Sequence, residues 1–133
     1  MSENLNLVRS IYADWERGEW GSADWAHPEI ELLSPDGPTP GTWTGLTAMA
    51  EVWRENLSAF SCFRVNADEY CELDGDRVLV FHTWSGRGKA SGVEVERMQA
   101  RSATLFHIRG SKVIRLVAYW DRDRALADLG LEA

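Results

Sequence analysis

The chain has 133 residues and a mass of 15.0 kDa, enough for one globular domain with a substantial core. Hydrophobic residues (44%) and charged residues (26%) occur in the proportions typical of globular proteins, which excludes a disordered chain. The formal net charge of −7 disfavours nucleic acid as a partner, because phosphate binding relies on clustered Lys and Arg. Seven tryptophans are an unusual number, and side chains of that size favour cores, pocket walls and interfaces.

The charges are divided unevenly along the chain. Residues 1–76 carry 15 acids and 4 bases, whereas residues 77–133 carry 6 acids and 10 bases. No linker separates the two parts, so we expect residues 1–133 to form a single domain whose halves attract each other. No apolar stretch is long enough to span a membrane and the N-terminus lacks a signal-peptide pattern, which predicts a cytoplasmic protein without membrane contact.

The first third of the chain predicts a helix, a short second helix and a strand. A helical stripe ends at Gly18, the short helix is expected over 22–26, and the strand over 29–33. Residues 34–41 hold three of the four prolines and predict a stiff loop. The apolar stripe of the first helix consists of Leu5, Val8, Ile11, Tyr12 and Trp15.

The middle of the chain predicts a helix followed by a β-hairpin. Thr44 is the expected N-cap of the helix, whose stripe is Leu46, Met49, Trp53, Leu57 and Phe60. A strand over 63–73 then reaches Asp74-Gly75, a typical hairpin turn. The following strand, 78–84, is apolar on both parities, which predicts that both of its faces are covered.

The last third predicts two more strands and a helix. Residues 86–92 (GRGKASG) are expected to form a flexible connection, and a long strand lies within 93–109. Gly110-Ser111 turns the chain into a strand over 113–120. Asp121 then caps a helix that ends at Gly130. Strands joined by hairpins, with helices segregated to one face, predict an α+β domain whose curved sheet encloses space for a small molecule.

Several motifs give the chain a family resemblance. These are DWERGEWGSADW after the first helix, the strand entry HPEIEL, GTWTGLTAM before the third helix, the hairpin ELDGDRVLV and the closing YWDRDRALADLG. In this order they resemble the nuclear-transport-factor-2-like (NTF2-like) superfamily, and within it the SnoaL-like branch of polyketide-cyclase relatives. The resemblance implies a cone in which a curved antiparallel or mixed sheet wraps three to four helices around a pocket.

Asp121 is the leading catalytic candidate by this resemblance. In SnoaL-like cyclases an aspartate in a similar position, at the end of the last strand, serves as general acid or base. Such a carboxyl needs its pKa raised by an apolar wall, which Tyr119 and Trp120 could supply. The alternative is purely structural, because Asp is a preferred N-cap and Asp121 begins a helix.

His82 and Tyr12 are the other catalytic candidates. His82 shares the parity of Val80 and Trp84, so it is a proton shuttle or hydrogen-bond donor if that parity faces the cone, and an interface or core residue if it does not. Tyr12 matches by position the first-helix tyrosine of ketosteroid-isomerase relatives, but no acid lies on strand 99–108 to complete their set. Core packing is the alternative for Tyr12.

Arg101 and five tryptophans are the candidate ligand-binding residues. A buried Arg101 would require a carboxylate or an anionic ligand, and it lacks the Asp two residues away that epoxide-hydrolase relatives use. Trp43 is a candidate lid over the cone mouth. The aromatic set is Trp15, Trp43, Trp53, Trp84 and Trp120, which fits either an open pocket for a flat apolar ligand or a pocket filled by its own side chains.

Two functions remain open at this point. One is a cofactor-free acid/base enzyme acting on a hydrophobic cyclic or polyketide-like substrate. The other is a non-catalytic binding protein that keeps the cone. Cys62 and Cys71 lack a CxxC or Cys/His pattern, so no metal site is expected. The resemblance and the two-sided apolar strand 78–84 also predict a homodimer paired through the outer sheet face.

Overall fold

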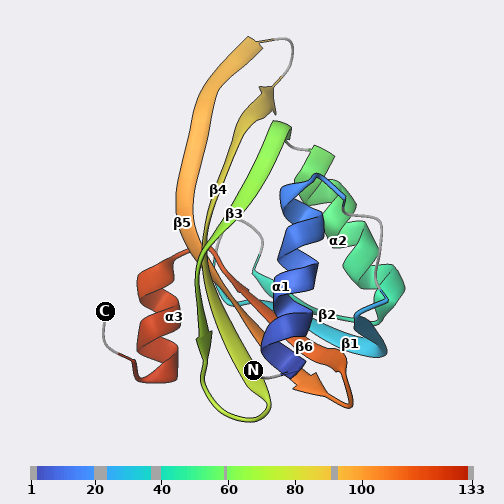
Figure 1. The fold of residues 1–133 in the computed structure, drawn as a ribbon. Coiled ribbons are helices and arrows are strands. Elements are labelled where there is room, and N and C mark those ends of the chain that lie inside the picture. The colour runs from blue at the N-terminus through green and yellow to red at the C-terminus, as the bar shows by residue number, and fades with distance from the viewer. Residues whose placement is uncertain (1–2, 20–23, 37–39, 59, 91–92, 132–133) are drawn as a thin grey trace.

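The computed structural model describes residues 3–19, 24–36, 40–58, 60–90 and 93–131 (Figure 1), with side chains described outside 56–63 and 87–100. These residues form three helices and one six-stranded sheet. The helices are α1 (Glu3–Glu16), α2 (Leu46–Ser58) and α3 (Arg122–Leu129). The strands are β1 (Ala26–Ser34), β2 (Gly41–Thr44), β3 (Phe60–Glu72), β4 (Arg77–Ala90), β5 (Val93–Arg109) and β6 (Lys112–Tyr119).

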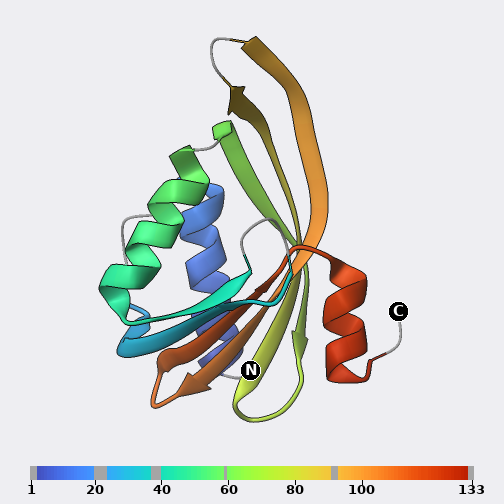
Figure 2. The ribbon, with the colours of Figure 1, turned by 180° about the vertical axis from the view of Figure 1, so that it is seen from behind.

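The sheet has the order β2-β1-β6-β5-β4-β3 and is mixed, because β1 pairs with β6 in parallel and all other neighbours are antiparallel. It curves strongly. Helices α1 and α2 fill its concave face and α3 covers part of the convex face, as Figures 1 and 2 show from opposite sides. This arrangement confirms the expected α+β cone, whereas the expectation that the helices lie on one face is wrong, because α3 lies on the opposite face from α1 and α2.

Alternation along β4 places its apolar side chains on both faces. Val78, Val80 and Trp84 join the main core on the concave side. Leu79 is fully buried in a second cluster that includes Ala125 of α3, and Phe81 packs against that cluster. The prediction that both faces of this strand are covered is confirmed, and on the convex side α3 of the same chain provides the cover.

The two long helices form for the reasons expected, with differences at both ends of α2. At its end, Phe60, expected on the apolar stripe of the helix, is instead the first residue of β3. Val8, Ile11, Tyr12 and Trp15 are the buried stripe of α1. Thr44 is not the N-cap of α2, because it is the last residue of β2. Gly45 takes the capping position instead: its carbonyl accepts the Met49 N–H at 3.0 Å, and its φ of +95° favours glycine.

Two segments near the N-terminus differ from expectation. Of the short helix expected over 22–26, Asp24 and Trp25 form a turn and Ala26 already begins β1, while residues 22 and 23 lie outside the described residues. Pairing with β6 explains the strand, since Ala26 lies opposite Val113. The proline-rich loop over 34–41 ends in β2, a strand that its composition concealed, and residues 37–39 of that loop also lie outside the described residues.

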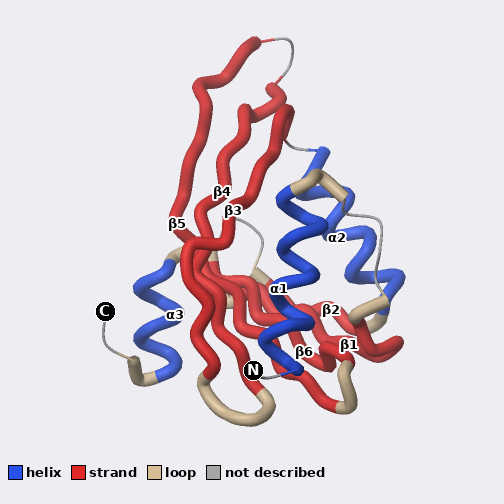
Figure 3. The backbone as a smooth tube through the Cα atoms, viewed as in Figure 1, coloured by secondary structure: helices blue, strands red, loops and turns tan. Residues whose placement is uncertain are grey.

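The expected flexible connection over 86–92 is wrong for most of its length. β4 continues to Ala90 and pairs with β5, with Gly86 opposite Met98 and Lys89 opposite Glu94. Ladder pairing with a long neighbour outweighs the low strand propensity of glycine. The tube in Figure 3 shows these two strands extending beyond the rest of the sheet.

The turns and the last helix follow the sequence prediction. Gly110 and Ser111 both have positive φ, which is typical of a tight hairpin turn. Asp121 caps α3 by accepting the Asp123 N–H at 3.0 Å, and Gly130 ends the helix in the left-handed conformation. None of the described helices is both long enough and apolar enough to cross a bilayer.

Candidate active site on the concave face

A small polar cluster lies within the apolar concave face. The Tyr12 hydroxyl, from α1, is 3.0 Å from Nδ1 of His82 on β4, and the Thr104 hydroxyl of β5 also hydrogen-bonds to it. Tyr12 is fully buried, whereas His82 keeps 9% of its surface exposed. The structure therefore brings together two of the three catalytic candidates and adds Thr104 to them.

Burial keeps this cluster neutral. Removal from water, and to a lesser extent the nearby positive charge of Arg122, lower the pKa of His82 to about 4. Removal from water also raises the pKa of Tyr12 above its ordinary value. At neutral pH the imidazole is thus uncharged and offers one N–H donor and one acceptor. It is a hydrogen-bonding group and, with such a low pKa, a weak base.

Aromatic rings surround Tyr12. Trp15 and Tyr70 meet its ring edge-on, with centroids 4.9 and 6.1 Å away, and Phe106 lies at 6.0 Å. Trp15 in turn contacts Trp53 at 5.8 Å and Trp25 at 6.0 Å. Two predicted ligand-binding tryptophans, Trp15 and Trp53, therefore form part of the apolar wall around the polar cluster.

Two further predicted tryptophans are joined through Ser102. The Trp84 indole N–H donates to the Ser102 hydroxyl at 3.0 Å, and that hydroxyl donates to the Trp120 carbonyl at 2.8 Å. The Trp84 and Trp120 rings are 5.3 Å apart and nearly perpendicular. Ser102 lies directly opposite His82 in the β4–β5 register, so this pair of rings borders the same cluster.

The end of β6 is held by an acid from the loop after β1. The Asp36 carboxylate accepts the Trp120 N–H at 2.9 Å with one oxygen and the Asp121 N–H at 3.0 Å with the other. This two-point contact fixes the chain where the last strand turns into α3. Trp43, on β2, is half-buried against the main core and folds its ring close to Gly41.

Asp121 and Arg101 do not join the cluster. The Asp121 side chain is exposed and caps α3, so the structure shows the capping role and no apolar wall around its carboxyl. Arg101 is exposed and shares the parity of Ala103 and Leu105, which pack in the convex cluster. Because Arg101 is exposed, it does not require the carboxylate or anionic ligand that a buried arginine would.

Ser102 and Thr104 were missed from the sequence. With His82 they are the buried polar residues of the described chain, and both point to the concave side. Their parity, shared with Phe106 and Ile108 on β5, was a usable signal. Trp25, buried beside Trp15, was also missed because its segment was expected to be helical.

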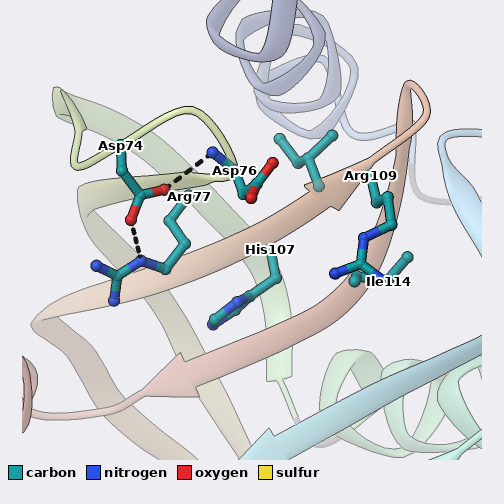
Figure 4. A pocket seen from close by; sticks show the side chains of 7 residues that line it. Asp74, Asp76, Arg77, His107, Arg109 and Ile114 are labelled. Carbon is teal, nitrogen blue, oxygen red and sulfur yellow. Dashed lines mark hydrogen bonds and ion pairs between the residues drawn. The ribbon is translucent and has the colours of Figure 1, made fainter.

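A separate pocket of about 170 Å³ lies at the β3–β4 turn, away from the cluster (Figure 4). Figure 4 shows Arg77 and Arg109 on either side of His107, with Asp74 bound to Arg77. None of the predicted site residues lines this pocket. Within the described chain, no group of three His, Cys, Asp or Glu side chains is arranged to hold a metal ion.

Solved structures of similar fold cover nearly the whole chain. An NTF2-like protein of unknown function from Burkholderia pseudomallei has a TM-score of 0.78 at 19% identity, over 96% of this chain and 97% of that one. TerC, co-crystallised with polyporic acid, has a TM-score of 0.74 at 23% identity, over 96% and 98%. A candidate polyketide cyclase from Xanthomonas campestris pv. campestris has a TM-score of 0.70 at 16% identity, over 94% and 95%.

At these identities the structural matches establish the fold, and the family comes from the sequence. No curated protein sequence matches the chain. The family model of the SnoaL-like domain matches residues 8–116, which is most of the chain. Together with the NTF2-like architecture, this match confirms the resemblance drawn from the motifs. The chain belongs to the SnoaL-like family, on the NTF2-like fold.

Proposed function

We propose that this protein binds a hydrophobic cyclic small molecule on its concave face, through a carbonyl or hydroxyl oxygen of the ligand. The observation that carries the proposal is the 3.0 Å hydrogen bond between Tyr12 and His82, buried within a wall of aromatic rings. A few convergent polar groups in an apolar, aromatic surround are typical of small-molecule sites. Flat rings stack well against such a wall, and the polar cluster would fix their orientation.

The hydrogen-bond directions favour His82 as the group that meets the ligand. If Thr104 donates to the Tyr12 oxygen and Tyr12 donates to Nδ1 of His82, each of the two hydroxyl protons makes one hydrogen bond. The neutral imidazole then carries its proton on Nε2, for which no partner is found among the described residues. That N–H is free to donate to a ligand oxygen.

The same geometry favours binding over catalysis. A donated hydrogen bond from Nε2 polarises a carbonyl, which is the electrophilic half of an isomerase or cyclase reaction. The other half needs a base, and no carboxylate of the described residues is hydrogen-bonded to Tyr12 or His82. We therefore place the non-catalytic, cofactor-free binding protein first and the acid/base enzyme second.

The family and its structural relatives support a ligand in this fold. The SnoaL-like match and the fold shared with a candidate polyketide cyclase agree with a cyclic ligand. TerC has the same fold and was crystallised with polyporic acid. We also retain the homodimer as a proposal, although α3 already covers the convex apolar residues that first suggested it.

The test compares three bicyclic compounds that differ at one position. α-Tetralone has a carbonyl, α-tetralol a hydroxyl, and tetralin neither. Tryptophan fluorescence should report saturable binding of all three, with the two oxygen compounds about tenfold tighter, as one hydrogen bond to a ligand provides. His82→Leu should remove that preference, since leucine has no hydrogen-bond donor.

His107→Leu is the matched control, because His107 is also a strand histidine but has the convex parity. It should leave the preference for oxygen compounds unchanged. Equal affinity of wild type and His82→Leu for α-tetralone would contradict the proposal. Acceleration by the protein of deuterium exchange at the carbon next to the α-tetralone carbonyl would instead favour the enzyme.

A further inference from the structure

A β-bulge lies directly opposite His82. The β3–β4 register shifts between Ala67, which faces His82, and Glu69, which faces Phe81, so that Asp68 is the extra residue. β3 is the edge strand of the sheet, and a Glu16 oxygen from α1 accepts the Ala67 N–H at 3.1 Å. Bulges redirect neighbouring side chains and interrupt pairing, so this position decides how the His82 segment is held.

Arg122 braces this segment from the convex side. Its guanidinium donates to the His82 carbonyl at 3.2 Å and to the Asp68 carboxylate at 3.1 Å. The carboxylate also accepts the Thr83 hydroxyl at 2.6 Å, and the guanidinium lies 5.0 Å from the Phe81 ring centre. Arg122 therefore contacts the bulge residue and two residues of β4, and the bulge residue itself holds a third, Thr83.

The Arg122 guanidinium is largely buried at this contact. Only 25% of the Arg122 side chain is exposed, and its Nε is buried with no partner among the described residues. One terminal nitrogen of the guanidinium donates to both the Asp68 carboxylate and the His82 backbone carbonyl. Such a contact constrains the backbone from which the imidazole projects.

We propose that Arg122, oriented by Asp68, is a positioning residue for His82: it fixes the bulged β4 backbone so that the imidazole stays within reach of the Tyr12 hydroxyl. This inference rests on the proposed function in one respect, namely that His82 contacts the ligand. Arg122 itself acts from the opposite face of the sheet.

The first test needs no ligand. Ring-nitrogen NMR of His82 in the wild type should show a single tautomer with the proton on Nε2. Arg122→Gln should move both ring signals towards the average of two exchanging tautomers, because the imidazole loses its fixed distance from Tyr12. Arg122→Lys should do the same, and since it keeps the positive charge, a change in both variants assigns the effect to geometry.

Arg124→Gln is the matched control, because Arg124 lies on the same helix and bonds only Asp128 in the described chain. It should leave the His82 signals unchanged. If Arg122→Gln fails to fold, Arg122→Lys decides the question. His82 signals identical to wild type in the folded Arg122 variants would overturn the proposal, even if those variants melt at a lower temperature.

The second test asks whether Arg122 affects ligand binding through His82. Arg122→Gln should weaken α-tetralone binding about tenfold, within the range of coupling between residues of one network, and should have no further effect in the His82→Leu background. An equal loss in both backgrounds would show that Arg122 does not act through His82. If His82→Leu leaves α-tetralone binding intact, the proposed function fails, while the ring-nitrogen spectra still decide whether Arg122 positions His82.

Discussion

At the residue scale, the central feature is a histidine kept neutral by burial. His82 lies among aromatic and aliphatic side chains, and its pKa falls from 6.5 to about 4. Tyr12 satisfies one ring nitrogen, so the imidazole is oriented without a charged partner. A neutral, oriented donor suits recognition of a ligand oxygen better than removal of a proton.

Burial of His82 predicts a specific dependence of stability on pH. Because the pKa is lower in the folded protein, the unfolded chain takes up the proton first and folding is penalised as the pH falls from 6.5 towards about 4. Above pH 6.5 the full stability is present. The shift corresponds to about 3 kcal/mol of the free energy of unfolding.

Urea unfolding of wild type and His82→Gln, at neutral pH and near pH 4, isolates this contribution from the titration of carboxylates. The wild type should lose about 3 kcal/mol more than the variant over this interval. Parallel pH dependence in the two proteins would show that His82 is not desolvated in the folded state.

The sequence identified Tyr12 and His82 individually but not their contact. That contact depends on which parity of β4 faces the helices, and an apolar strand with two covered faces does not reveal this. The same ambiguity made Arg101 a candidate, although its parity is convex. Ser102 and Thr104 were overlooked because small hydroxyl residues within a strand carry no strong signal until the register is known.

At the element scale, α3 has two roles: it covers the convex cluster and carries Arg122 to the β3 bulge. Its start is defined by Asp121 and its end by Gly130. Both ends were predictable, since capping depends on local residue types. The bulge was not predictable, because the register of two strands is a property of the folded sheet.

Substitution at Asp121 separates capping from catalysis. Asp121→Ala should destabilise the protein by about 1 kcal/mol through loss of the N-cap, whereas Asp121→Asn keeps a capping oxygen and should stay within a few tenths of a kcal/mol of the wild type. Thermal unfolding measures both. Binding of α-tetralone should be unchanged in each variant, and a loss in Asp121→Asn as well as in Asp121→Ala would show that the carboxylate takes part in binding.

The extension of β4 and β5 shows where composition misleads. Residues 86–92 contain three glycines and suggest a loop, yet β4 continues through Ala90. The length of β5, 17 residues, was the informative signal, since a strand so long needs an equally long neighbour. Pairing between elements outweighs local propensity here.

At the scale of the whole molecule, the uneven charge distribution has a structural counterpart. Ion pairs join the acidic first half to the basic second half, as Glu31 binds Arg115 at 3.2 Å and Asp68 binds Arg122 at 3.1 Å. The first pair connects neighbouring strands β1 and β6, and the second links β3 to α3. The expected attraction between the halves is thus seen within the sheet and between the sheet and α3.

The proposed homodimer is also a property of the whole molecule. Light scattering at micromolar concentration should give a mass of about 30 kDa, twice the chain mass of 15.0 kDa. α3 covers only part of the convex face, and the long strands β4 and β5 pass beyond it (Figure 1). A mass near 15.0 kDa would contradict the dimer and leave the binding proposal unaffected.

The most direct test of the central claim, that His82 meets the ligand oxygen on the concave face, is ring-nitrogen NMR of the wild type at saturating α-tetralone. The Nε2 signal of His82 should move on binding, while Nδ1, held by Tyr12, and both nitrogens of His107 should stay in place. A saturated protein in which the His82 ring signals do not move would contradict the account.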